Sequence, residues 1–428
     1  MRILEAGSDE FEEYFRQIRG RGRIFDAALE RTVVAIVEDV MQRGDDALFE
    51  YTARWDGFSV DADTVEASAD EIKEAVRHVS AEDLSIMRVA AERIEWFHER
   101  QRQESWTMSD EDGVELGQMV LPLERVGIYA PGGLASYPST ILMTAIPARI
   151  AGVGEIILTT PCQGGQLSPL IATAAQLAGV TRIFKIGGAQ AIAAMAFGTK
   201  SVPRVDKIVG PGNAYVAAAK KMVFGQVGID MIAGPSEVLI IADKTANPSY
   251  AAADLLAQAE HDRMAAAVFI TPYEDLADEV AAEVEKQLVN MPRKEIASDS
   301  LQTYGAAIVA KDMDEAIGLA NRFAPEHLAL MVENPLEHLA AIRNAGAVFL
   351  GMHTPEALGD YIAGPNHVLP TGGTARFASP LGVYDFYKRT SVLSFSQKAL
   401  ERYGMQTMRL AELEGLHGHK MSVRRRLK

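Results

Sequence analysis

From residue 125 onward, the chain alternates short β-branched runs with windows of helical periodicity, and this alternation constrains its fold more than any other feature. Consecutive parallel strands need a crossover helix between them, so the pattern is typical of a doubly wound sheet. Two such series occur. We therefore predict an α/β fold with two doubly wound, Rossmann-like open-sheet domains and a ligand cleft between them. The expected strands are Arg125–Tyr129, Glu155–Thr159, Arg182–Lys185, Lys207–Val209, Val238–Ala242, Ala267–Thr271, Ala306–Ala310, Leu328–Val332 and Ala347–Leu350.

The two ends of the chain follow other patterns. Residues 1–25 are charged and weakly patterned, and we expect an N-terminal helical segment with a helix from Asp9 to Arg19. After Arg389 the pattern becomes polar and helical, which predicts a small helical C-terminal tail domain over residues 381–428. Such a tail is too small to bury a core of its own, so it must dock on its own subunit or on a neighbour.

Composition argues against several classes of protein. The net charge is −16, whereas a nucleic-acid partner requires a basic face. The single cysteine, Cys162, excludes an internal disulfide and fits a reducing compartment. No apolar signal region opens the chain, and the most apolar stretch, residues 141–153, is interrupted by Pro147 and Arg149. We therefore expect a cytoplasmic protein that binds no membrane.

The stretch from Gly359 to Leu381 is rich in glycine and proline, which break helices and strands. A loop this long within an α/β chain is usually functional or disordered, and apolar anchors such as Phe377 argue against disorder. It carries Asp360 and His367, a carboxylate and an imidazole. We interpret it as a site loop whose partner residues come from elsewhere in the chain.

Gln258 and His261 stand three residues apart and so share one face of a helix that ends near residue 260. Taken alone, the pair is better explained as a polar helix end. Its interpretation as a metal site gains weight if Asp360 and His419 converge on it. A glutamine oxygen, two imidazoles and a carboxylate form a mixed set that suits zinc, with manganese or cobalt feasible.

Glu326 and His327 follow Pro325 at the junction between a helical window and a strand. Proline disfavours helix at the residue before it, Ala324, and so sets a sharp junction. A Glu–His pair can divide general-base work between two reaction steps. A capped turn explains these residues equally well on this pattern alone.

Three glycine-rich segments follow expected strands, at residues 129–133, 187–190 and 210–215. Each can direct backbone N–H groups and a helix N-terminus towards phosphate. None has the G-x-G-x-x-G fingerprint, and the third, which comes closest, has Tyr215 where the last glycine should stand. A dinucleotide is therefore feasible, but not in the standard binding mode. Cys162 has no partner base nearby, and we expect a lone thiol rather than a nucleophile.

Longer motifs carry a family resemblance. They are GPGNAYVAAAK, GIDMIAGPSEVLIIAD, LLAQAEHD, FAPEHLAL, GDYIAGPNHVLPTGGTARF, YDFYKRTS and EGLHGHKMSV. Through them the chain resembles the histidinol dehydrogenase family from about Phe25 to Arg425. The resemblance implies a zinc- and NAD-dependent four-electron oxidation of L-histidinol to L-histidine through histidinal, the last step of histidine biosynthesis, with one zinc ion per subunit.

The resemblance also implies roles for single residues. Glu326 and His327 would be the proton acceptors. The zinc ligands would be Gln258, His261, Asp360 and His419, where the motif spacing favours His419 over its rival His417. The NAD contacts would be Tyr129, Gln190 and Asn213. The substrate contacts would be Ser236, Gln258, His261, His327, Asp360, His367, Glu414 and His419.

Domain organisation and assembly follow from the same resemblance. Residues 26–128 together with 237–380 would form the first α/β domain, which carries the metal and substrate residues. Residues 129–236 would form the second α/β domain, with the NAD contacts. Residues 381–428 would be a dimerisation tail that completes the site of the partner in a homodimer.

Two other activities stay open at this point. A related zinc- and NAD-dependent dehydrogenase could act on another small alcohol, such as a sulfonated diol. However, the candidates Glu326, Asp360 and Glu414 are acidic, which favours a cationic amino alcohol over an anionic substrate. A zinc hydrolase, which would produce no NADH, is the less favoured alternative.

Overall fold

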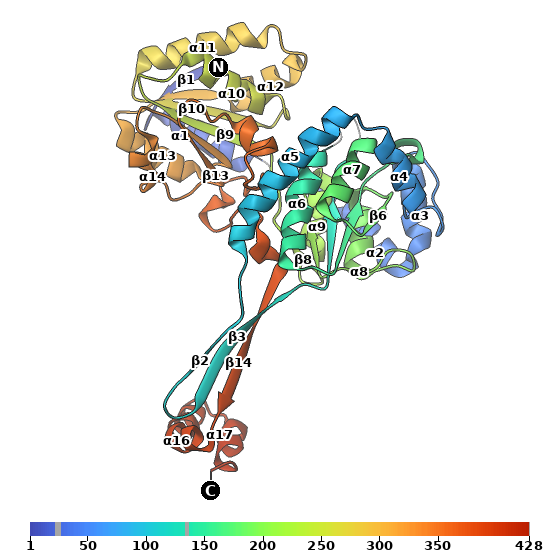
Figure 1. The fold of residues 1–428 in the computed structure, drawn as a ribbon. Coiled ribbons are helices and arrows are strands. Elements are labelled where there is room, and N and C mark those ends of the chain that lie inside the picture. Colours follow the sequence, from blue (N-terminus) through green and yellow to red (C-terminus); the bar gives the residue numbers. More distant parts are fainter. Residues whose placement is uncertain (22–26, 133–136, 428) are drawn as a thin grey trace.

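The structure is a computed structural model that describes residues 1–21, 27–132 and 137–427. Two α/β lobes lie side by side, and a long β-ribbon extends away from them to a small helical module at the C-terminus (Figure 1). Within these three ranges, no helix is long and apolar enough to cross a membrane.

The first lobe is built on a six-stranded parallel sheet with strand order β1-β11-β10-β9-β12-β13. Its central strands β9 and β10 are buried along their whole length, as expected where helices cover both faces of a sheet. Helices α10, α11 and α12 share a core with one face, and α1 and α13 with the other. The strands are β1 (Arg2–Glu5), β9 (Glu237–Ala242), β10 (Ala266–Thr271), β11 (Ala306–Val309), β12 (His327–Met331) and β13 (Ala347–Leu350). The helices are α1 (Asp9–Gly20), α10 (Pro248–Ala259), α11 (Glu274–Leu288), α12 (Lys294–Tyr304), α13 (Met313–Phe323), α14 (Pro335–Leu339), α15 (Glu356–Tyr361) and the short η3 (Thr374–Arg376).

The second lobe is built on a five-stranded parallel sheet with strand order β6-β5-β4-β7-β8. Helices α4 to α7 pack on one face, and α2, α3, α8 and α9 pack on the other. The strands are β4 (Arg125–Tyr129), β5 (Glu155–Thr159), β6 (Arg182–Phe184), β7 (Lys207–Val209) and β8 (Gly228–Ile229). The helices are α2 (Ala27–Arg43), α3 (Asp45–Trp55), α4 (Ala69–Arg77), α5 (Ala81–His98), η1 (Glu99–Gln101), α6 (Pro138–Ala151), η2 (Gln163–Gly165), α7 (Pro169–Ala178), α8 (Gly188–Phe197) and α9 (Ala214–Val223).

The ribbon is a three-stranded antiparallel sheet with order β14-β3-β2. Helices α16 and α17 pack against each other at its far end (Figure 1). The elements are β2 (Trp106–Ser109), β3 (Val114–Pro122), η4 (Val383–Phe386), β14 (Tyr387–Phe395), α16 (Gln397–Leu413) and α17 (His417–Arg424).

The predicted α/β class with two open sheets and a small helical tail is confirmed, and each expected strand is present. The N-terminal segment differs from its prediction. Beyond the expected helix, residues 2–5 form strand β1, which pairs in parallel with β11 and so makes this segment part of the first lobe. Residues 22–25 of the predicted segment lie outside the described residues.

Two further predicted boundaries differ from the structure. Residues 27–98 were expected in the first domain, but their buried side chains share cores with the five-stranded sheet; Val33, for example, lies in one cluster with Phe184. The tail was expected to be helical after Arg389. Instead β14 runs to Phe395 because it pairs along its whole length with β3, a distant partner that local periodicity does not reveal.

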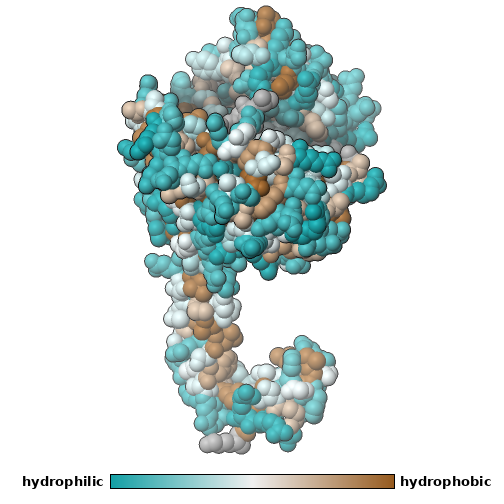
Figure 2. Space-filling view, turned by 90° about the vertical axis from the view of Figure 1, so that its right-hand side faces the viewer, coloured by the Kyte–Doolittle hydropathy of each residue, from teal (hydrophilic) through white to brown (hydrophobic). Residues whose placement is uncertain are grey.

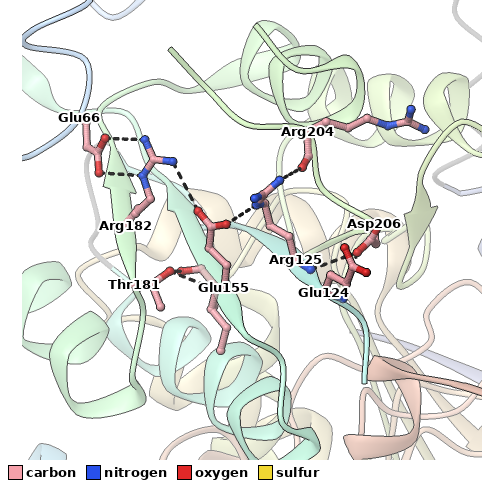
Figure 3. A network of polar contacts seen from close by, with 9 residues as sticks. Glu66, Glu124, Arg125, Glu155, Thr181, Arg182, Arg204 and Asp206 are labelled. Atoms are coloured by element: carbon pink, nitrogen blue, oxygen red, sulfur yellow. Dashed lines mark hydrogen bonds and ion pairs between the residues drawn. The ribbon is translucent and has the colours of Figure 1, made fainter. Parts of the chain in front are cut away.

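A charged network closes the amino-terminal edge of the five-stranded sheet (Figure 3). Arg182 holds Glu66 with two hydrogen bonds and also reaches Glu155, which in turn pairs with Arg125. The backbone N–H of Arg125 donates to Asp206 (3.0 Å). With this edge tied together by ion pairs, the opposite, carboxyl edge is the one left to bind a ligand.

Candidate functional site

A cavity of about 590 Å³ is lined by residues of both lobes. The second lobe contributes Gly210 to Asn213, which follow strand β7 and so lie at the carboxyl edge of its sheet. The first lobe contributes Ser236, just before β9, and His327, the first residue of β12. The five-stranded sheet therefore faces the cavity with the carboxyl ends of its strands, and the six-stranded sheet faces it with the amino ends.

The peptide groups of Glu237 orient both predicted proton acceptors. Its backbone N–H donates to Glu326 Oε2 (2.9 Å), and its carbonyl oxygen lies 3.0 Å from His327 Nδ1. Helix α13 ends at Ala324, whose left-handed backbone (φ 52°) and following proline redirect the chain into β12. The sharp junction expected at Pro325 is thus present, and it places both side chains against the start of the neighbouring strand β9.

The tautomer of His327 follows from these contacts. A carbonyl oxygen can only accept, so Nδ1 carries the proton and donates to Glu237. Nε2 then holds a lone pair, has no hydrogen-bond partner within the described residues, and lies 3.9 Å from Asp360 Oδ1. Burial lowers the pKa of His327 to about 4, which keeps the ring neutral at pH 7. The side chain is therefore ready to accept a proton at Nε2.

Glu326 is buried beside this ring, with Oε2 3.8 Å from His327 Nδ1. Burial raises the pKa of Glu326 well above its usual range, while the hydrogen bond from Glu237 acts in the opposite direction. The side chain of Glu237 is itself held by Arg21 (2.9 Å) and by the N–H of Gly372 (2.7 Å). A carboxylate of raised basicity is suited to take a proton from water.

Glu356 is a site residue that the sequence analysis missed. It is buried on α15, and its Oε1 lies 3.2 Å from His327 Nδ1. With its amide nitrogen turned towards Glu356, Gln258 donates to this carboxylate and accepts from the N–H of Glu237 (3.0 Å). Burial raises the pKa of Glu356 well above its usual range. A signal was present in the sequence, because Glu356 and Asp360 stand four residues apart and so share a helix face.

The predicted site loop borders the cavity, but it begins within a helix. Asp360 lies on the last turn of α15 rather than in a loop, and its carbonyl accepts from His367 Nδ1 (3.0 Å). The other ring nitrogen of His367 lies 3.4 Å from Thr140 Oγ1 of the second lobe. Burial raises the pKa of Asp360 to about 6 and lowers that of His367 to about 4. Asn366, in the same stretch, has a structural role, since its side-chain amide donates to the carbonyl of Met143.

The predicted zinc ligands fall into two groups. Gln258, His261 and Asp360 line the cavity, and their oxygen and imidazole donors fit the chemistry of zinc. His419 is exposed on α17, as is Glu414 at the end of α16, and the helical module lies at the far end of the ribbon, away from both lobes (Figure 1). Among the residues that the structure describes, no three His, Cys, Asp or Glu side chains are grouped closely enough to hold a metal. One chain therefore does not bring all four ligands together.

The predicted NAD contacts lie at the carboxyl edge of the five-stranded sheet. Tyr129 ends β4, and its hydroxyl accepts from the N–H of Gly188 (3.2 Å) at the start of α8. Gln190 is buried on α8, and neither polar atom of its amide has a partner among the described residues. Asn213 caps α9, because its Oδ1 accepts from two backbone N–H groups. Gly133, at the end of the first glycine-rich segment, lies outside the described residues.

Cys162 is a free, buried thiol, as the lone-thiol interpretation predicted. Burial raises the pKa of Cys162 to about 12, so the reactive thiolate is scarce at neutral pH. The thiol does not line the cavity.

Comparison with known proteins agrees with this geometry. The sequence model of the histidinol dehydrogenase family matches residues 20–427. The chain belongs to the histidinol dehydrogenase family. The histidinol dehydrogenase of Geobacter sulfurreducens is 54% identical over 100% of both chains, and that of Acinetobacter baylyi is 50% identical over 100% of this chain and 99% of the relative. The crystal structure of the Elizabethkingia anophelis histidinol dehydrogenase superposes with a TM-score of 0.93 at 39% identity, covering 100% of this chain and 98% of that one. Histidinol dehydrogenases are oxidoreductases of histidine biosynthesis.

Glu356 provides a test of this site. We expect Glu356→Ala to lower kcat/KM of histidinol oxidation by roughly 10-fold to 100-fold, the usual cost of removing a group that orients a metal ligand. The physical reason is that Gln258 loses its acceptor and His327 loses a neighbouring carboxylate. Glu337→Ala, at an exposed acid of α14, serves as the matched control. Steady-state kinetics on folded protein, verified by thermal unfolding, make the measurement, and wild-type kcat/KM in Glu356→Ala would contradict the assignment.

Proposed function

We propose that the chain oxidises L-histidinol to L-histidine through histidinal, with NAD as hydride acceptor and one zinc ion per subunit. The observation that carries this proposal is the pair Glu326 and His327. Both are buried, both are held by the peptide groups of Glu237, and both border a cavity that the two lobes share. Two bases of different chemistry beside one cavity suit a reaction that removes protons in two successive oxidations.

His327 acts in the oxidation steps. Its Nε2 lone pair points into the site while Nδ1–H stays bound to the carbonyl of Glu237. It accepts the hydroxyl proton of the alcohol, and later that of the aldehyde hydrate, as hydride leaves the same carbon. Because burial holds the pKa of His327 near 4, the ring is in its basic form at pH 7.

Glu326 acts in the step between the two oxidations. It takes a proton from the water that adds to the aldehyde, and burial raises its basicity for this task. A hydrate is required because the alternative, a thioester, needs a reactive thiolate in the site. The only cysteine, Cys162, is buried, does not line the cavity, and has its pKa raised to about 12.

Gln258, His261, Asp360 and the partner's His419 would hold the zinc ion. The cavity holds buried carboxyl groups, Glu326 and Glu356 among them, whose charged forms are disfavoured by burial, and a cation would stabilise them. Zinc supplies positioning and polarisation of the substrate when it is bound. Ser236 and His367 line the same space and would contact the substrate, together with Glu414 of the partner subunit.

Tyr129, Gln190 and Asn213 would contact NAD, which accepts the hydrides when it is bound. Gln190 supports this assignment, since neither polar atom of its buried amide has a partner among the described residues and a ligand would supply one. Asn213 uses its oxygen to cap α9, so its amide nitrogen is left to donate.

The cavity favours a cationic amino alcohol over the sulfonated alternative. Glu326, Glu356 and Asp360 give it acidic walls, and Lys220, which also lines it, is neutralised by Asp230. A hydrolase would not need the dinucleotide contacts of the second lobe. The acidic composition and single cysteine support the cytoplasm as the place of the reaction.

We further propose a homodimer in which the tail completes the site of the partner. The ribbon and its helices expose apolar side chains, among them Met108, Leu393 and Met405, each more than half exposed. Figure 2 shows hydrophobic residues along this stalk. Apolar surface of this kind marks an interaction site. A two-fold exchange would bury it and bring Glu414 and His419 to the other cavity.

The first test is of the reaction itself. Purified protein with L-histidinol and NAD should produce NADH, followed by absorbance. A chelator should abolish this activity and added zinc should restore it, because the site ligands without their metal cannot position the substrate. His261→Ala should lose both bound zinc, measured by elemental analysis, and turnover. Full activity in metal-stripped protein would contradict the zinc proposal, and no NADH from zinc-loaded wild type would contradict the function.

The second test separates the two bases. His327→Gln should slow both oxidations, by about 10² or more, the usual size of general-base catalysis. Glu326→Gln should chiefly slow hydration, and so spare the oxidation of histidinol to histidinal relative to that of histidinal to histidine. Assays of histidinol and histidinal as separate substrates measure the split. An equal loss on both substrates in Glu326→Gln would reject the division of labour.

The third test addresses the shared site. His261→Ala and His419→Ala proteins, each inactive alone, are mixed after reversible dissociation. With exchanged tails, each mixed dimer has one intact site, and random pairing makes half of the dimers mixed. Activity should therefore recover to roughly a quarter of wild type. If each tail folds back on its own subunit, no complete site forms, so no recovery despite heterodimers seen by native mass spectrometry would disprove the exchange.

A further inference from the structure

We propose that the buried ion pair of Lys220 and Asp230 is a clamp that positions the NAD-binding edge of the second lobe. This inference rests on the proposed function, because it concerns the residues that would contact NAD. Lys220 and Asp230 are positioning residues in this proposal and are not themselves assigned a contact with the cofactor.

The clamp holds both backbone groups of one residue, Gly210. Lys220 Nζ donates to the carbonyl oxygen of Gly210 (2.9 Å), and Asp230 Oδ2 accepts from its N–H (2.7 Å). Lys220 and Asp230 also pair directly with each other. Their side chains are 3% and 1% exposed, so water does not compete for these contacts.

Only glycine fits at position 210. Its φ is +111°, and an added Cβ would lie 2.2 Å from the carbonyl oxygen of Tyr129. The turn after β7 is therefore pressed against the end of β4. Three residues later Asn213 caps α9, and the Tyr129 hydroxyl binds the N–H of Gly188 at the start of α8. One clamped turn thus fixes the relative positions of the ends of β4 and β7 and the start of α9.

Stability alone does not explain this pair. Buried ion pairs pay a desolvation cost that often cancels their attraction, and well-packed apolar side chains of similar volume can replace them without loss. What an apolar pair cannot do is hold a carbonyl and an N–H of the same peptide turn in fixed directions. Asp230 also opens the segment that crosses to β9, where Glu237 orients Glu326 and His327. Along the chain, Asp230 of the clamp therefore lies between the cofactor edge of the second lobe and the residues that orient the bases.

The experiment separates positioning from stability with two variants and a control. Lys220→Met leaves Asp230 buried without its partner, so it should unfold at a lower temperature and bind NADH more weakly. In Lys220→Met with Asp230→Asn, no charge is left unpaired, so the unfolding temperature should recover largely. The carbonyl of Gly210 still lacks its donor there. Lys221→Met removes the neighbouring lysine, which pairs with Glu30 instead, and should behave as wild type.

NADH binding, followed by its fluorescence, is the deciding measurement. The double variant should bind NADH roughly tenfold more weakly than wild type, the size of one hydrogen bond to a charged group. Its KM for histidinol should change by a smaller factor than its Kd for NADH. Wild-type NADH affinity in the double variant would overturn the clamp, because stability would then be its whole role. Failure of wild-type protein to bind NADH would instead refute the proposed function.

Discussion

The site depends on the two backbone polar groups of one residue, Glu237, at the start of the central strand β9. Its N–H fixes Glu326, its carbonyl fixes His327, and its side chain is tied to Arg21 and Gly372. The parallel pairing of β12 with β9 then determines which side chains lie next to Glu237, because it sets His327 opposite Val238. The fold itself thus orients both proposed bases.

The same pairing explains why the cavity lies where it does. Open α/β sheets usually bind ligands at the carboxyl ends of their strands. The second lobe follows this rule with Tyr129 and Gly210 to Asn213. The first lobe departs from it, because His327 and Ser236 stand at the amino ends of β12 and β9. Opposed edges let one cavity combine helix N-termini and glycine turns, which suit a dinucleotide, with rigidly held bases and carboxylates, which suit a small polar substrate.

Local pattern predicted the strands of both sheets except β1 and the two-residue β8, since each of the others is a short apolar run between turn residues. It failed where pairing at long range decides. Strand β14 forms because β3 lies beside it, and β1 forms because β11 does. Glu326 and His327 could be predicted as a pair from the sequence because they are adjacent. The spacing of Glu356 and Asp360 places both on one helix face, but the role of Glu356 comes from contacts with Gln258 and His327, which are distant in sequence. Residues of the site that are neighbours only in space cannot be found from spacing.

The position of the tail shows why the four proposed zinc ligands do not meet within one chain. Its ribbon leads α16 and α17 away from the lobes, and β14 and β3 pair along nine residues, which keeps the ribbon from folding back on itself. The cavity of the same chain meanwhile gathers carboxyl groups, and burial disfavours their charged forms. A bound cation and ligands from a second chain would relieve this cost. Assembly would then be coupled to metal binding, because neither the exposed apolar ribbon nor the acidic cavity is satisfied in the isolated subunit.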